Sequence, residues 1–416
     1  MEKDVMSSVE AIPFWVRFYN AALSSVTYIW QMFWPVKLAL FYPFPSGVLS
    51  GARLVLAIMI LGIGTYTAWL LRTKRPYFIV GWLWYLGMIL PALGLVQVGG
   101  HAHADRYTYL PQIGLYLAAT WGAADLSASW RYRRQILWTA AAVIIGLLTW
   151  RAWVQTSFWK NNESIWTRTL AVTSNNPVAH LMLGHVFLEK GQLDSAILQF
   201  QKSLKILSQS RRYGSSAALA HYGLGNALAA KGQRSGAIPH YEKALRIKPR
   251  YAAAESDLAL ALFREERIDE AIVHWVRALS MDPTMVYAYA GLGDALLRKH
   301  RPGDSIACYQ KALELAPQSA PILNGLAWVL ATSSDAQFRN GARAVQLARQ
   351  ADQLTQGKDP RIIRTLAAAY AESGQFGEAI HVTERALKLA PAKSDPALAK
   401  QLQMDIDLYR MNFPLR

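Results

Sequence analysis

A pattern that recurs every 34 residues constrains the fold of this chain most strongly. A small residue preceded by leucine stands at Gly225, Ala259 and Gly293, and again, preceded by Leu326, at Ala327. Within each period an alanine or serine, an aromatic residue, a second alanine and a proline follow at fixed spacing in the clearest units. A unit of this length holds two helices, which bury their apolar faces only by stacking on neighbouring units. The recurrence therefore predicts an all-α array of helix pairs.

The clearest units cover residues 224–249, 258–283 and 292–317. Less regular units begin at Leu183, Leu326 and Leu366. This period and residue pattern resemble the tetratricopeptide repeat (TPR). The resemblance implies a TPR α-solenoid of six repeats in residues 177–391. We expect a connecting helix in residues 159–176 and a C-terminal capping helix in residues 392–416.

Such arrays bind proteins or peptides along the surface formed by the first helix of each pair. Register along the repeats places seven candidate groove residues there: Tyr222, Asn226, Phe263, Arg264, Tyr287, Asp294 and Arg298. The alternative for each is an ordinary solvated surface position. Repeats that grip a C-terminal carboxylate usually carry Lys and Asn at matched groove positions. Only Asn226 fits that pattern, so a clamp of this kind is not expected.

The first 158 residues have a different composition. They hold 17 of the charged residues but 11 of the 15 tryptophans, and tryptophan favours the membrane interface. Stretches with few or no charges predict four transmembrane helices: 52–71, 77–98, 109–126 and 135–154. A fifth candidate, 21–40, contains Pro35 and Lys37, and Pro91 is expected to kink the second. The alternative, buried core helices of a soluble protein, does not suit four such stretches so close together.

Basic residues in short loops predict the orientation. Arg72, Lys74 and Arg75 follow one predicted helix, and a second cluster, 131–134, precedes the last one. Two helices separate the clusters, so both clusters can face the cytoplasm. The repeats then lie on the other side: the periplasm if the membrane is a bacterial inner membrane, or the lumen in a eukaryote.

The loop 99–111 is predicted on the same side as the repeats and is the most polar stretch beside an apolar helix. A guanidinium can donate two hydrogen bonds to the oxygens of one phosphate, so Arg106 is a candidate for binding a lipid-linked phosphate. The candidate residues around it are His101, His103, Asp105, Tyr107 and Tyr109. Two alternatives remain open: an Asp105–Arg106 pair that caps a helix, and a His-Ala-His metal site, for which no third ligand is in view.

The segments 34–43, 81–87 and 104–111, followed by the repeats, resemble the C-terminal half of transmembrane and TPR-containing O-mannosyltransferase-like proteins and their bacterial relatives. These are similar to protein mannosyltransferases of the GT-C class. The resemblance implies a polyprenyl-phosphate sugar as donor substrate, with Arg106 on its phosphate, and repeats that present acceptor proteins.

The chain departs from that family in one respect. Family members carry acidic catalytic residues in their first outer loop, and no acidic pair stands at such a place here. The catalytic residues are therefore unknown, and we expect no sugar transfer by this chain alone. Two hypotheses stay open: the rear part of a glycosyltransferase, or a stand-alone membrane-tethered TPR scaffold without catalytic activity.

The net charge of +16 would suggest nucleic acid, but the basic residues do not gather in an aromatic-basic run. Part of the excess is explained by the two loop clusters. We therefore expect a protein or peptide partner and the lipid bilayer, and no nucleic acid. The sequence gives no metal-ligand spacing and no cofactor motif, and the single Cys308 cannot form an internal disulfide.

Overall fold

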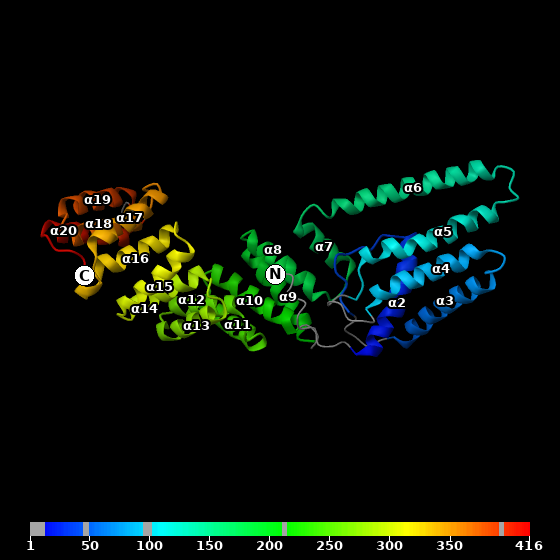
Figure 1. The fold of residues 1–416 in the computed structure, drawn as a ribbon, viewed down its shortest axis with the longest axis horizontal. Coiled ribbons are helices and arrows are strands. Elements are labelled where there is room, and N and C mark those ends of the chain that lie inside the picture. The colour runs from blue at the N-terminus through cyan, green and yellow to red at the C-terminus, as the bar shows by residue number, and fades with distance from the viewer. Residues whose placement is uncertain (1–12, 45–49, 95–101, 210–213, 391–394) are drawn as a thin grey trace. The chain divides into compact units, whose positions relative to one another are not determined.

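The chain is described by a computed structural model over residues 13–44, 50–94, 102–209, 214–390 and 395–416. Its regular elements in these ranges are helices, so the predicted all-α fold is confirmed (Figure 1). The chain forms two compact units. The first comprises Met1–Gly232 with Arg246–Lys248, and the second comprises Gln233–Leu245 with Pro249–Arg416.

The first unit begins with what we call the apolar helix group, α2–α6. Its helices are α2 (Phe14–Phe33), α3 (Gly51–Leu70), α4 (Pro76–Ile89), α5 (Tyr109–Leu126) and α6 (Arg133–Ser157), with the short 3-10 helices η1 (Leu90–Leu93) and η2 (Asp105–Thr108). Three helical spans in the described residues are long and apolar enough to cross a membrane: Gly51–Leu70, Pro76–Leu93 and Arg133–Ser157. A membrane crossing by α2 or α5 stays a prediction.

Two predicted bounds need correction. The helix expected over 21–40 spans Phe14–Phe33 instead, because Pro35 lacks a backbone N–H and disfavours helical geometry in the residue before it. The helix expected over 77–98 stops being α-helical at Ile89 and tightens into η1, which contains Pro91 and ends at Gly94 with φ +70°. Residues 95–98 lie outside the described ranges.

Close backbone contact joins α4 to α5. A Cβ atom added to Gly81 would lie 2.3 Å from the carbonyl oxygen of Gly114, and one added to Gly114 would lie 2.3 Å from that of Gly81. Small residues at such a crossing are typical of helix pairs in membranes. By contrast, α6 has no buried residue along its 25 residues.

The remaining helices follow the apolar helix group along the chain. In the first unit these are α7 (Asn162–Val172), α8 (Pro177–Glu189), α9 (Leu193–Leu207) and α10 (Gly214–Ala230). In the second they are α11 (Arg234–Ile247), α12 (Ala252–Arg264), α13 (Ile268–Met281), α14 (Val286–Arg298), α15 (Pro302–Leu315), α16 (Ala320–Thr332), α17 (Gly341–Leu354), α18 (Pro360–Glu372), α19 (Phe376–Leu389) and α20 (Pro396–Arg410). We call α8–α19 the repeat region.

Small residues and aromatic rings alternate in the core of the repeat region. The alanines at the repeat positions Ala271, Ala312 and Ala379 are fully buried. Trp275 fills the space that Gly291 leaves open, since a Cβ on Gly291 would lie 2.4 Å from the indole ring. The residues that carry the 34-residue pattern are thus the ones that let the helices approach.

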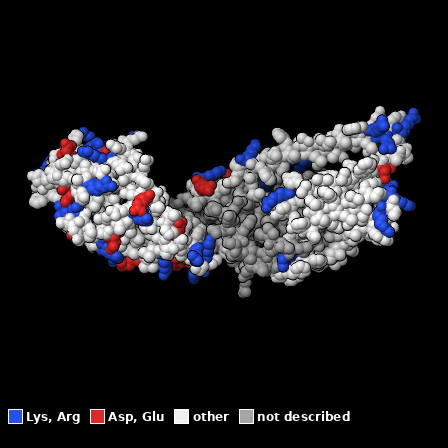
Figure 2. All heavy atoms as spheres, in the orientation of Figure 1, with Lys and Arg blue, Asp and Glu red and all other residues white. Residues whose placement is uncertain are grey.

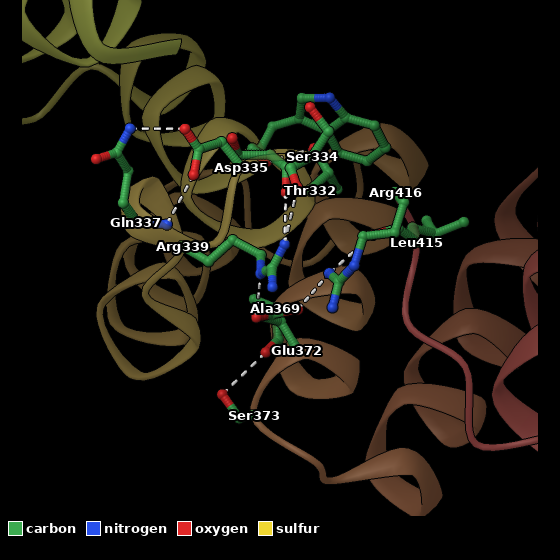
Figure 3. A network of polar contacts seen from close by, with 12 residues as sticks. Thr332, Ser334, Asp335, Gln337, Arg339, Ala369, Glu372, Ser373, Leu415 and Arg416 are labelled. Carbon is green, nitrogen blue, oxygen red and sulfur yellow. Dashed lines mark hydrogen bonds and ion pairs between the residues drawn. The ribbon is translucent and has the colours of Figure 1, made fainter.

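A polar network ties an inserted segment and the C-terminal tail to α18 (Figure 3). The carboxylate of Glu372, at the end of α18, pairs with Arg339 at 3.0 Å and also with Arg416. Arg339 in turn donates to the carbonyl oxygens of Ser333 and Ser334 at 3.1 and 3.2 Å. One partly buried carboxylate therefore holds two otherwise irregular segments against the last repeat.

Candidate functional site

The loop before α5 is held by a partly buried carboxylate, that of Asp105. Asp105 accepts hydrogen bonds from the Gln31 side chain, the Ala39 backbone and the Tyr42 hydroxyl, with donor–acceptor distances of 3.0 to 3.1 Å. The Tyr28 hydroxyl donates to the Ala104 carbonyl at 3.2 Å and accepts from the Ala104 N–H at 3.0 Å. The loop is therefore fixed against α2 and the segment that follows it.

Burial gives Asp105 an unusual protonation equilibrium. Loss of solvent raises the pKa of its carboxyl from 3.8 to about 6, although the hydrogen bonds from Tyr42, Ala39 and Gln31 act in the opposite direction. The same burial, together with the nearby Asp105 charge, raises the pKa of the Tyr42 phenol. Tyr42 therefore stays a neutral donor at physiological pH.

The predicted phosphate-site residues alternate between inward and outward positions. His103 stacks on Tyr42 with ring centroids 4.0 Å apart, and Tyr107 packs against the buried cluster around Tyr28 and Tyr85. Arg106 is exposed, with its guanidinium 5.2 Å from the Tyr107 ring centroid, and Tyr109 is 77% exposed. His101 lies outside the described residues.

The alternative of an Asp105–Arg106 capping pair is wrong. The Asp105 side chain makes no capping bond to η2 and is engaged by α2 and the segment 39–42 instead. Within the described ranges, no cluster of three His, Cys, Asp or Glu side chains could hold a metal ion. Sequence reasoning missed Gln31 and Tyr42, although Tyr42 lies in one of the segments that carries the family resemblance.

The two basic turns lie at one end of the apolar helix group. Asp125 at the end of α5 pairs with Arg75 at 3.5 Å and accepts a hydrogen bond from Tyr77 at 2.6 Å, which joins the first basic turn to the end of the helix that precedes the second. Figure 2 shows Lys and Arg side chains gathered at this end, beside the largely uncharged surface of the helices.

The repeats begin beside a different part of the group. Arg168 in α7 donates to the Val36 carbonyl at 2.6 Å, and Asn176 at the start of α8 donates to the Phe41 carbonyl at 3.1 Å. The segment 36–42 thus contacts the first repeat helices and, through Tyr42, the Asp105 loop. The candidate phosphate loop and the start of the repeats share this one segment.

In the second unit, five of the predicted groove residues lie on α12 and α14. The guanidinium of Arg298 lies 5.8 Å from the ring centroid of Phe263 and pairs with Glu266 at 3.2 Å. Asp294 accepts a hydrogen bond from Tyr309, and the charges of Arg264 and Arg298 act on it. Tyr287, at the start of α14, is 83% exposed.

The other two predicted groove residues, Tyr222 and Asn226, lie on α10 in the first unit. Both are partly buried. The Oδ1 atom of Asn226 is buried and has no hydrogen-bond partner within the described part of the chain. A buried amide oxygen without a donor is costly, so this position suits a ligand or a bound water.

A pocket of about 310 Å³ lies between the first helices of the last two repeats and the N-terminal part of α20. Its lining includes Asn324, Trp328, Arg361, Arg364 and Asp395. Sequence reasoning missed this pocket. A signal existed, because Asn324 and Arg364 stand two residues before Leu326 and Leu366, the same register as Tyr222 before Leu224.

Comparison with known proteins identifies the repeats. Family models described as tetratricopeptide repeat match residues 178–206, 218–251, 256–320 and 290–358. The predicted tetratricopeptide repeats are therefore confirmed. Among solved structures, PilF of Pseudomonas aeruginosa covers 55% of this chain and 97% of its own at 20% identity and a TM-score of 0.45. YrrB, titled a TPR protein with an unusual peptide-binding site, covers 46% and 92% at 19% identity and a TM-score of 0.38.

Curated relatives include two named protein O-mannosyl-transferases. Human TMTC4 is 29% identical over 127 residues, which are 30% of this chain and 17% of the relative. Tmtc2 of Drosophila melanogaster is 27% identical over 116 residues, which are 28% of this chain and 12% of the relative. The matched part thus spans less than a fifth of either relative.

Proposed function

We propose that this chain, whose C-terminal part is an array of tetratricopeptide repeats, is a membrane-tethered protein that binds a protein or peptide partner through its repeats. The main support is the row of first helices in the second unit, where α12, α14, α16 and α18 contact one another in succession. That row presents exposed aromatic and charged side chains, among them Tyr287 and Arg298, beside a pocket. The three helices of the described residues that are long and apolar enough to cross a bilayer would provide the tether.

Photo-crosslinking tests the partner-binding surface. A photoreactive phenylalanine analogue at Tyr287 lies on a first helix, and the matched control at Val276, 52% exposed, lies on a second helix. We expect crosslinks to a discrete protein from position 287 and few from position 276. Equal yields at both positions would contradict binding through the first helices.

The proposed topology places the two basic turns in the cytoplasm and the repeats outside it. It is supported by the Arg75–Asp125 contact, which holds the first basic turn against the end of α5, and by the excess of basic residues in the two turns. In a Cys308→Ser background, an impermeant maleimide added to intact cells should label Gln318→Cys in the repeats and not Ser129→Cys in the basic turn. The reverse labelling pattern would overturn the orientation.

A second candidate function is that of the C-terminal part of a protein O-glycosyltransferase that uses a polyprenyl-phosphate sugar donor. The supporting observation is the Asp105 loop, which is fixed from within and leaves the Arg106 guanidinium exposed at the end of an apolar helix. A guanidinium held there can pair with a lipid phosphate while the polyprenyl chain follows the helices.

Lipid binding tests this second function separately. In lipid nanodiscs containing polyprenyl phosphate, native mass spectrometry should detect the phosphate lipid on the wild type and much less on Arg106→Gln. Arg131→Gln, which removes an exposed cation in the basic turn, is the control and should retain the lipid. Equal retention by both variants would exclude Arg106 as the phosphate ligand.

A further inference from the structure

The pocket at the end of the repeats contains an amide oxygen that has no hydrogen-bond donor among the described residues. The Oδ1 atom of Asn324 is buried and accepts no hydrogen bond from any described residue, and its side chain faces the pocket. A primary amide offers an acceptor and a donor side by side, which match the N–H and C=O groups of a peptide backbone. Because a backbone offers both groups, this match does not depend on which way the amide is turned.

The two arginines of the pocket differ in whether another residue already neutralises their charge. Arg364 is bound to the buried carboxylate of Asp405 at 2.6 Å and lies over the Trp328 ring at 5.1 Å, so its charge is neutralised and its position fixed. Arg361 is exposed, and its guanidinium has no ion pair with any described residue. Arg361 is therefore the cation available to a ligand.

The acidic residue in the pocket wall, Asp395, caps the N-terminus of α20. Asp395 is the N-cap of α20, and its side chain accepts a hydrogen bond from the Leu398 N–H at 3.1 Å. The positive end of the helix dipole offsets its charge at that position. Among the described residues, the lining thus combines the Arg361 guanidinium, the amides of Asn324 and Gln401 and the partly buried ring of Trp328.

We propose that this pocket binds a short extended peptide segment that carries a carboxylate, with Asn324 on a backbone amide and Arg361 on the carboxylate. The inference rests on the proposed function, since it assumes that the repeats bind a peptide or protein. A volume of about 310 Å³ is at the lower end of ligand pockets and fits a few residues, not a folded domain. The carboxylate belongs to an Asp or Glu side chain or to a free C-terminus.

The test uses the purified full chain in detergent micelles and an array of randomised, N-acetylated octapeptides. One set ends in a free carboxylate and has no acidic side chain. A second set ends in an amide and has a fixed central Glu, and a third set ends in an amide without acidic residues. Stronger binding of the first or second set identifies the source of the carboxylate.

Two variants and one control decide whether the pocket is responsible. Arg361→Gln should weaken binding of the preferred acidic set about tenfold and leave the neutral set unchanged. Asn324→Leu should weaken binding of all three sets, because it removes the backbone contact. Lys400→Gln neutralises an exposed cation of α20 outside the pocket and should change nothing. Circular dichroism checks that each variant is folded, and Arg361, being exposed, tolerates replacement.

The outcomes separate this inference from the proposed function. If peptides bind and neither pocket variant changes their affinity, the pocket is not the site, while partner binding by the repeats stands. If no set binds the wild type, the inference is overturned, and crosslinking from position 287 decides the proposed function independently.

Discussion

Among the described glycines, the shortest contact that an added Cβ would make is with backbone in the apolar helix group and with an aromatic ring in the repeat region. A Cβ on Gly81 would collide with the backbone of α5 at Gly114, whereas a Cβ on Gly291 would collide with the Trp275 ring. In water, burial of an aromatic ring in such a gap removes apolar surface from solvent and stabilises the fold. In a bilayer the surroundings are as apolar as the ring, so helices gain more from close backbone contact. The packing at Gly81 and at Gly291 is thus the kind that a bilayer and water, respectively, favour, although Gly64 in the apolar helix group also faces an aromatic ring, that of Trp82.

The two regions also differ in how many residues of their helices are buried. In α18, nine of 13 residues are buried, while α6 buries none of its 25. The exposed side chains of α6 are largely apolar, including Ile144, Leu147 and Trp153. Such a surface is unfavourable in water, and it suits contact with lipid or with further apolar helices. Four predictions test this contrast, from the largest expected effect to the smallest.

Of the four substitutions, Trp275→Ala should lower the free energy of unfolding most, because the ring is 2% exposed and fills the gap at Gly291. We expect a loss of about 4 kcal/mol in the free energy of unfolding of the repeat region, as for other buried tryptophans. Urea unfolding followed by circular dichroism measures it, with Val276→Ala as the exposed control. Equal losses for both variants would contradict the role of the aromatic rings.

Gly81→Ala should cost about 3 kcal/mol, because the added Cβ meets backbone, which cannot move aside as a side chain can. The control is Gly62→Ala, where a Cβ has no neighbour within 4 Å, and it should be neutral or slightly stabilising. Thermal unfolding in detergent micelles and in bicelles compares the two. A melting temperature unchanged by Gly81→Ala would show that α4 and α5 do not cross at this point.

The Asp105 network should make stability depend on pH. The folded carboxyl has a pKa of about 6 against 3.8 for the free group, so the folded state binds the proton more tightly. Stability is then highest below about pH 4 and falls as the pH rises to about 6, by about 2 kcal/mol or at most about 3. Asp105→Asn should abolish this dependence in thermal unfolding between pH 4 and 7. Asp125→Asn, which removes a more exposed carboxylate, is the control, and an unaltered pH profile in Asp105→Asn would contradict the assignment.

Lys299→Gln should have the smallest effect. Lys299 pairs with Asp269 across neighbouring repeats at 2.9 Å, but both side chains are largely exposed. Exposed pairs contribute less than about 1 kcal/mol, and we expect about 0.3 kcal/mol, lost at high salt. A loss comparable with that of Trp275→Ala would mean that charges, and not buried rings, hold the repeats together.

Much of the fold followed from the sequence because its signals are local. The 34-residue recurrence predicted helix pairs, and the buried positions at Ala271, Ala312 and Ala379 belong to that pattern. The uncharged stretches predicted the apolar helices, although the first lay earlier than expected because Pro35 ends it. The groove register placed Phe263 and Arg298 on neighbouring first helices, where they contact each other.

The sequence by itself determined which segments are helical and which residues stay small or large, since these depend on spacing within a turn or a repeat. Only the tertiary structure decided that Asp105 points inward to Gln31 and Tyr42 while Arg106 faces out, because those partners are more than 60 residues away. The same holds for the pocket, where Asn324 and Arg361 meet α20 from separate repeats. The periodicity of the sequence predicts which face of each helix is buried, but it does not predict which distant polar groups are left without hydrogen-bond partners.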